Sequence, residues 1–253
     1  MLLKIKNLNK SFDGIKAVNK CNFDVRENSI TGLIGPNGAG KTTIFNLITG
    51  LTSPDKGEII FEGTDITNLQ SYKISNLGIA RTFQLIRLLP NLTVMENLLV
   101  AKKQSGENFL AALFKKKKIK EELKINKERC LEFLKLVGLE EHANKLAINL
   151  SYGQRKLVEL ARCLATEADL LLLDEPVAGV NPVMREKIKK ILLKLKEQGK
   201  TILIIEHDMK FVMNVCETVI VMDEGQEIAI GNPEKIQNNS RVLEAYLGEK
   251  VKI

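Results

Sequence analysis

The chain has 253 residues, 44% of them hydrophobic, and its 38 lysines and arginines outnumber 31 acidic residues to give a formal charge of +7. A chain of this length can bury one large core or two modest ones. The positive excess is spread along the sequence, which indicates a solvated basic face rather than a nucleic-acid or anionic membrane surface. A base-stacking surface is also disfavoured, because only 5% of the residues are aromatic and none is tryptophan.

The cysteines and the apolar segments bear on the compartment of the protein. Four cysteines lie far apart without a C-x-x-C pair, namely Cys21, Cys130, Cys163 and Cys216. They are interpreted as buried small apolar residues in a reducing compartment. Residues 1–6 alternate like a strand and lack the apolar core of a signal peptide. No apolar run approaches the roughly 18–20 residues that cross a bilayer. We therefore expect a soluble, cytoplasmic chain that relies on other subunits for any membrane span.

The first 50 residues are predicted to form strands and then a glycine-rich loop before a helix. In the turn at 11–14, Phe12 could stack on an adenine held nearby, or it could be buried in the core. A strand over 29–34 leads into Gly35–Thr42, which fits the pattern G-x-x-x-x-G-K-[ST]. Apolar residues at helical spacing over 43–48, followed by Gly50, predict a helix directly after this loop.

This order of strand, glycine-rich turn and helix predicts a phosphate site. Glycines allow successive backbone N–H groups to point at a polyphosphate, and the helix N-terminus adds a favourable dipole. Lys41 is expected to reach the β- and γ-phosphates, and the Thr42 hydroxyl is expected to coordinate Mg²⁺.

The composition and the predicted secondary structure change in the middle of the chain. A turn at 53–57 and a strand over 58–63 come first, and a short apolar run over 78–84 ends in the polar Gln84. From about Leu92 to Gly138 the sequence is rich in leucine and lysine, and helical periodicity over 121–137 predicts an inserted helical subdomain. The run Lys115–Lys118 is interpreted as a solvated helix flank, with contact to acidic lipid or to a partner as the alternative.

Two apolar strands, over 170–174 and 201–205, are followed directly by polar residues. Buried parallel strands carry their ligand-binding residues at this end. Asp174 is placed to bind the Mg²⁺ shell, usually through water, and Glu175 to polarise an attacking water as general base. His207 could hydrogen-bond the γ-phosphate and this water-positioning carboxylate. Between the strands, Pro182 opens a helix that Gly199 closes, and the chain ends in a hairpin over 219–229 and a short helix.

A second anion-binding helix start lies at residues 149–156. Ser151 is a good N-cap, and the Gly153 amide beside it is exposed. The phosphate loop at Gly35–Thr42 and the helix start at Ser151 could bind phosphate in one site within the chain. If they belong to two chains, ATP would join a head-to-tail dimer with two composite sites.

With these motifs in this order, almost the whole sequence resembles the ATP-binding subunits of ABC transporters. Phe12 matches the adenine-stacking aromatic, Gly35–Thr42 the Walker A loop and Gln84 the Q-loop glutamine. Residues 150–154 match the signature, 170–175 the Walker B strand with its glutamate, and His207 the switch histidine. The resemblance implies an α/β P-loop NTPase fold with a mostly parallel core sheet, an N-terminal antiparallel β-subdomain and an inserted α-helical subdomain. The core and β-subdomain would span about 1–90 and 165–253, and the helical subdomain about 91–164.

The resemblance also implies the site residues. Lys41, Glu175 and His207 would be catalytic. The contacts to ATP within one chain would come from Phe12, Val18, Asn37, Gly38, Ala39, Gly40, Lys41, Thr42, Thr43 and Gln84. The opposite protomer would add Ser151, Gly153 and Gln154. Mg²⁺ would be bound by Thr42, Gln84 and Asp174, and Gln84 would relay the state of the nucleotide to a membrane subunit.

Two positions depart from the family pattern. Tyr152 stands where the signature usually has glycine, which changes side-chain bulk at the dimer seam. Asn181 stands where aspartate is commonest in the D-loop. Its neutral amide can still hydrogen-bond across the dimer interface, so we expect the difference to affect the rate of ATP hydrolysis but not the role of this position. The segments 78–84, 150–154 and 176–182, together with the lysine-rich insertion, are similar to the larger ATPase subunit of branched-chain amino acid importers.

The resemblance predicts the ATPase subunit of a membrane importer for branched-chain (hydrophobic) amino acids, at the cytoplasmic face of the membrane. It would close as an ATP-sandwich dimer, with itself or with a sister ATPase, and drive integral-membrane permease subunits. A substrate-binding protein would take part indirectly, and nucleic acid is not expected. The alternatives are another ABC system such as lipopolysaccharide export, or a soluble ABC ATPase acting on nucleic acid or ribosomes.

Overall fold

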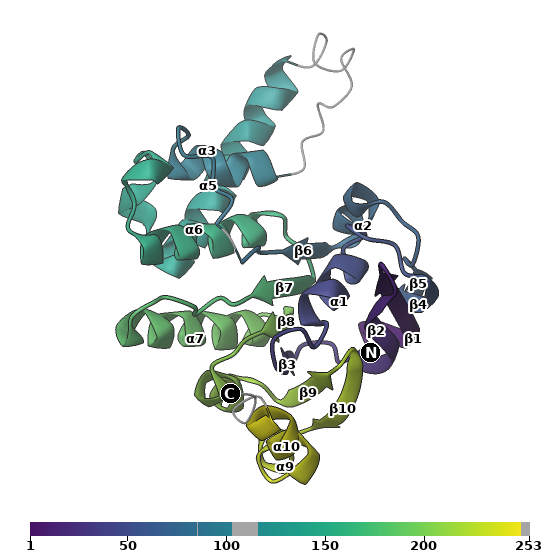
Figure 1. Ribbon diagram of the computed structural model, residues 1–253. Helices are drawn as coiled ribbons and strands as arrows, with labels where there is room; N and C mark the ends of the chain where they lie inside the picture. The colour runs from purple at the N-terminus through teal and green to yellow at the C-terminus, as the bar shows by residue number, and fades with distance from the viewer. Residues whose placement is uncertain (85, 103–115, 249–253) are drawn as a thin grey trace. The chain divides into compact units, whose positions relative to one another are not determined.

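The computed structural model describes residues 1–84, 86–102 and 116–248, which form two compact units (Figure 1). The first unit comprises Met1–Arg81, Asp169–Ala178 and Leu192–Ile253, and the second comprises Thr82–Ala168 and Gly179–Ile191. Of the lysine run, Lys115 lies outside the described residues, as do the side chains of the three lysines after it. None of the described helices is long and apolar enough to span a membrane.

An antiparallel sheet of the first unit is built from the N-terminal segment. Its strands are β1 (Leu3–Phe12), β2 (Ile15–Val25), β4 (Lys56–Phe61) and β5 (Thr64–Asp65), in the order β2-β1-β4-β5. A two-residue turn joins β1 to β2, and both of its residues, Asp13 and Gly14, have positive φ, as tight hairpins require. The expected strand over 58–63 begins two residues earlier, at Lys56, and ends in a turn at 62–63.

A six-stranded sheet forms the centre of the first unit. Its order is β10-β9-β3-β8-β7-β6, and every neighbouring pair is parallel except β10 with β9. The strands are β3 (Ile30–Ile34), β6 (Ile79–Arg81), β7 (Leu170–Asp174), β8 (Thr201–Ile205), β9 (Thr218–Asp223) and β10 (Gln226–Gly231). Every residue of β3, β7 and β8 is buried, because both faces of these strands are covered. That is why they are continuous apolar runs without alternation.

Helix α1 (Lys41–Ile48) lies against both sheets (Figure 1). It buries Ile44, Phe45, Leu47 and Ile48 in a hydrophobic cluster with side chains of β1, β2 and β4 and of β3, β7 and β8. The two sheets and α1 therefore share one core, which fixes the start of α1 against the parallel sheet. The remaining helices of this unit are α2 (Ser71–Leu77), α8 (Met209–Val215), α9 (Pro233–Gln237) and α10 (Ser240–Gly248). The single C-terminal helix expected from the sequence is thus two helices.

The second unit is helical. Its elements are α3 (Val94–Ala101), α5 (Lys116–Val137), the 3-10 turns η1 (Glu140–His142) and η2 (Ala147–Asn149), and α6 (Tyr152–Ala165), and α7 (Pro182–Glu197) begins in it. α3, α5 and α6 pack on one another. A capping box of Thr93 and Glu96 starts α3, and Gly138 follows the last residue of α5, as the sequence predicts.

Candidate nucleotide site

The segments with the predicted chemistry meet at one edge of the parallel sheet. β3, β8 and β7 are neighbours, and Leu33 of β3 and Asp174 of β7 both pair with Ile205 of β8. Because the strands are parallel, the residues after each of them emerge at the same edge. These are the glycine-rich loop after β3, Glu175 after β7, and residues 206–208 after β8.

The phosphate loop needs glycine at defined points. Gly35 has φ 148°, and a Cβ there would lie 2.0 Å from the Met222 carbonyl oxygen. Gly40 has φ 96°, and a Cβ there would lie 2.3 Å from the Ala17 carbonyl oxygen. A side chain at either position would push the loop away from the backbone on which it rests. Gly40 is also the N-cap of α1 and has no side chain to cap it. The first N–H groups of the helix can therefore bind an anion.

Lys41 places a buried cation at this loop. Its side chain is 6% exposed, and Nζ donates hydrogen bonds to the carbonyl oxygens of Gly35 and Pro36, each at 2.7 Å. The buried Lys41 ammonium can exchange these two neutral carbonyl acceptors for phosphate oxygens, which make stronger charge-assisted bonds. The loop therefore fits a polyphosphate.

Asp174 is held by an arginine that sequence reasoning did not single out for the site. Asp174 Oδ2 accepts a hydrogen bond from Arg81 Nη2 at 2.9 Å, and both side chains are almost completely buried. Arg81 Nη1 also donates to Asn46 Oδ1 at 2.7 Å, and the guanidinium lies 5.3 Å from the centre of the Phe45 ring. Arg81 thus connects β6, β7 and α1. Its signal in the sequence was a charged residue directly after apolar Ile79 and Ala80.

Glu175 and His207 are in direct contact. Their atoms Oε1 and Nε2 are 2.7 Å apart, and the Glu175 backbone N–H donates to the Ile205 carbonyl at 2.9 Å. Glu175 has φ 50°, a left-handed conformation that is uncommon for glutamate and that the surrounding structure must hold. The structure therefore places a histidine against the carboxylate that was predicted to polarise water. A further carboxylate, that of buried Glu206, directly precedes His207 in the sequence and accepts the His207 backbone N–H at 3.1 Å.

The residues expected near the base of the nucleotide differ in exposure. Phe12 is 45% exposed, and Lys10 Nζ lies 5.4 Å from the centre of its ring. The alternative of a core aromatic is therefore wrong, and the ring is accessible for stacking. Val18 is buried among the core side chains. In the loop itself, Asn37 and Gly38 are exposed, Ala39 is buried, and Thr43 is half-buried.

The predicted magnesium ligands are hard oxygen donors. The Thr42 side chain is exposed at the start of α1, and the Asp174 carboxylate ends β7. Hydroxyl and carboxylate oxygens suit Mg²⁺, which usually keeps several waters and takes few protein ligands besides substrate phosphates. These residues therefore fit the ion, and its binding stays a prediction, as does that of exposed Gln84 in the second unit.

In the second unit the signature segment forms a capped helix start. The Gln154 backbone N–H donates to Ser151 Oγ at 3.3 Å, and the Ser151 N–H donates to Gln154 Oε1 at 2.9 Å. This reciprocal capping box was readable in the S-x-x-Q spacing but was missed. Tyr152 lies against the D-loop, since a Cβ on Gly179 would be 3.2 Å from its ring. The contacts of Ser151, Gly153 and Gln154 with ATP stay predictions.

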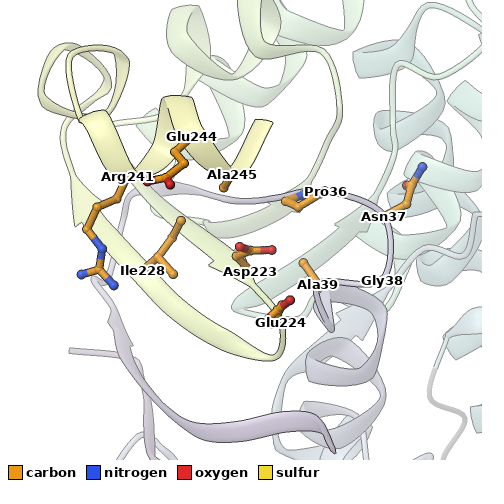
Figure 2. A pocket seen from close by; sticks show the side chains of 10 residues that line it. All are labelled: Pro36, Asn37, Gly38, Ala39, Asp223, Glu224, Ile228, Arg241, Glu244 and Ala245. Carbon is orange, nitrogen blue, oxygen red and sulfur yellow. The ribbon is translucent and has the colours of Figure 1, made fainter. Parts of the chain in front are cut away.

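A cavity of about 660 Å³ lies beside the loop at Pro36–Ala39 (Figure 2). It is lined on its other sides by the β9–β10 turn and by α10. Asp223, Glu224 and Glu244 contribute three carboxylates to it, against the single guanidinium of Arg241. This acidic lining disfavours a triphosphate inside the cavity itself.

A phosphate loop, a buried aspartate and a glutamate–histidine pair at one edge of a parallel sheet define a P-loop ATPase. Residues 18–178 match the family model described as ABC transporter, and residues 226–252 match the model described as branched-chain amino acid ATP-binding cassette transporter.

The chain is 43% identical over 250 residues to the high-affinity branched-chain amino acid transport ATP-binding protein BraF of Pseudomonas aeruginosa, covering 98% of each. It also resembles a nucleotide-free ATP-binding cassette from an ABC transporter, with a TM-score of 0.85, 38% identity, and 97% and 98% of the two chains covered. A dimeric bacterial ABC transporter cassette, MJ0796, gives a TM-score of 0.78 at 28% identity, with 92% and 99% covered. The chain therefore belongs to the ABC transporter family, as one of its ATP-binding, ATP-hydrolysing subunits.

Proposed function

We propose that this chain powers the import of branched-chain, hydrophobic amino acids. The observation that carries this proposal is the likeness to BraF over 98% of both chains. The match of residues 226–252 to a branched-chain amino acid cassette model supports it independently, because that segment lies outside the residues matched by the general family model. We place the subunit at the cytoplasmic face of the membrane, where permease subunits supply the span.

The proposed chemistry is hydrolysis of the γ-phosphoryl group of ATP. Lys41 and the loop N–H groups bind the phosphates, and Phe12 stacks on the adenine. Glu175 accepts a proton from the attacking water, whose oxygen displaces ADP from the γ-phosphorus. His207, whose Nε2 lies 2.7 Å from Glu175 Oε1, would orient the Glu175 carboxylate for this transfer. Thr42, Gln84 and Asp174 would hold Mg²⁺, which offsets the negative charge of the phosphates when bound.

We infer that each site is completed by a second chain. Ser151, Gly153 and Gln154 at the start of α6 would contact the ATP bound to the opposite protomer, which is either a copy of this chain or a sister ATPase. The dimeric cassette among the similar structures supports this arrangement. Gln84 and the helical subdomain, about residues 91–164, would transmit the conformational change that accompanies dimer closure to the permease.

The test is reconstitution of the chain with candidate permease subunits and a binding protein in liposomes. We expect leucine, isoleucine or valine to stimulate ATP hydrolysis and to be taken up. The control is Glu175→Gln in the same assembly, which should abolish both. An assembly that hydrolyses ATP but is stimulated by none of the three amino acids would overturn the cargo assignment and leave the ATPase assignment standing.

A further inference from the structure

Glu206 is a buried carboxylate between the two loops that carry Glu175 and His207. Its side chain is 2% exposed, so it does not reach solvent. Oε1 accepts a hydrogen bond from the backbone N–H of Val177 at 2.9 Å, two residues after Glu175. Oε2 accepts from the backbone N–H groups of His207 at 3.1 Å and Asp208 at 3.5 Å. One side chain therefore bonds the loop after β7 and the loop after β8 at the same time.

Only a carboxylate satisfies this arrangement. Ionised glutamate is an acceptor on both oxygens, whereas glutamine has one acceptor oxygen and one NH₂ group that only donates. A glutamine at position 206 would turn its NH₂ against a backbone N–H on one of the two loops. Burial raises the pKa of Glu206 and the charge of Glu175 adds to that rise, while the backbone N–H donors lower it. The backbone donors are thus the interactions that favour a charged group at this position.

The link from Glu206 completes a set of bonds around the catalytic pair. The Glu175 backbone donates to Ile205, and the Glu175 side chain meets His207. The first of these fixes the end of β7 against β8, and Glu206 fixes the next turn of both loops. The left-handed backbone of Glu175 needs such support, because a strained residue keeps its conformation only where its surroundings hold it.

We propose that Glu206 is a positioning residue for ATP hydrolysis. Its side chain holds the loop that carries Glu175 and the loop that carries His207 in a fixed arrangement relative to each other. It acts through backbone N–H groups and touches neither ATP nor the attacking water. The proposal depends on the catalytic roles proposed for Glu175 and His207. A displacement of about 1 Å in the position of a catalytic group is enough to lower a rate on the order of 100-fold.

The test compares Glu206→Gln with wild type and with Glu227→Gln in the full-length chain. Glu227 is a matched control, because its Oε2 also accepts a backbone N–H, from Asn22 at 2.9 Å, but it lies on β10 away from the catalytic pair. We expect Glu206→Gln to lower kcat at least about tenfold while the Kd for a fluorescent ATP analogue changes less than about twofold. Glu227→Gln should leave both values at the wild-type level. A wild-type kcat for Glu206→Gln, or an equal loss in kcat and affinity, would overturn the proposal.

A second readout does not require hydrolysis. The chain has two histidines, His142 and His207, so their ring signals in a nitrogen–proton NMR spectrum can be assigned with His142→Gln. In Glu206→Gln we expect the His207 signals to shift and those of His142 to stay unchanged. Unchanged His207 signals would overturn the proposal even in a chain without ATPase activity, whereas failure of the proposed function would appear as absent hydrolysis in wild type. If Glu206→Gln does not fold, Glu206→Asp is used instead, and a wild-type kcat in that variant counts against the proposal.

Discussion

At the scale of single residues, Arg81 carries a buried charge that forms an ion pair with the buried carboxylate of Asp174. Removing one member of a buried pair leaves the other charge uncompensated, so Arg81→Ala should lower the free energy of unfolding by about 3–5 kcal/mol. The measurement is urea unfolding followed by circular dichroism. Lys6→Ala is the control, because its pair with Glu58 is exposed on both sides and should contribute less than about 1 kcal/mol. Equal losses in the free energy of unfolding for the two substitutions would contradict a larger contribution from the buried pair.

The four cysteines allow a second prediction at this scale. All are buried, and burial raises the pKa of Cys130 to about 11 and of Cys163 and Cys216 to about 12, with that of Cys21 also raised. The thiolate is the reactive form and is only a very small fraction of each cysteine at a pH well below its pKa, so the native protein should react slowly with Ellman's reagent at pH 8. Unfolding in guanidinium should release all four thiols. Rapid reaction of the native protein would contradict their burial.

At the scale of elements, the sequence predicted the strands that local composition determines. β3, β7 and β8 are runs of apolar residues because each is covered on both faces. The position of β8 beside β7 was expected from the chemistry of His207 and is confirmed, whereas the pairing of β8 with β3 was not predicted, because it depends on residues far apart in the chain. The same reason explains why Arg81 and Glu206 were missed as site residues. Arg81 contacts Asp174 and Glu206 contacts Val177, and a local sequence pattern predicts neither of these contacts.

The packing of α8 on β3 gives a prediction about glycine. A Cβ on Gly32 would lie 2.9 Å from Val212 Cγ1 and 3.1 Å from Cys216 Sγ, both in the closely packed interior. Gly32→Ala should therefore lower the free energy of unfolding by about 1–3 kcal/mol through overpacking. Gly231→Ala is the matched control, since its Cβ would also meet an atom at 2.9 Å, but that atom is on the flexible side chain of Lys235. We expect the control to stay within about 0.5 kcal/mol of wild type in the same thermal or urea unfolding experiment.

At the scale of the whole molecule, the predicted ATP ligands are divided between the two units. The phosphate loop, Glu175 and His207 belong to the first unit, while Ser151 and Gly153 belong to the second. The fold class was predictable because the order of motifs along the chain is specific to ABC ATPases, and the similar structures confirm it. Whether the start of α6 binds ATP held by its own chain or by another chain was not predictable, because the exposed N–H groups of a helix N-terminus bind an anion in the same way in both cases.

If each ATP site is shared by two chains, as proposed above, ATP should control the association of those chains. Glu175→Gln keeps the phosphate loop and Lys41 but loses the carboxylate that we propose accepts a proton from water, so it should bind ATP and hydrolyse it very slowly. With saturating ATP we expect it to elute as a dimer in size-exclusion chromatography with light scattering, and as a monomer with ADP. Adding Lys41→Ala to the same variant should abolish the ATP-dependent dimer, because a charged contact to the phosphates is lost. A monomer at saturating ATP would contradict a homodimer and direct the search to a sister ATPase, which a mixture of the two purified chains with ATP would reveal.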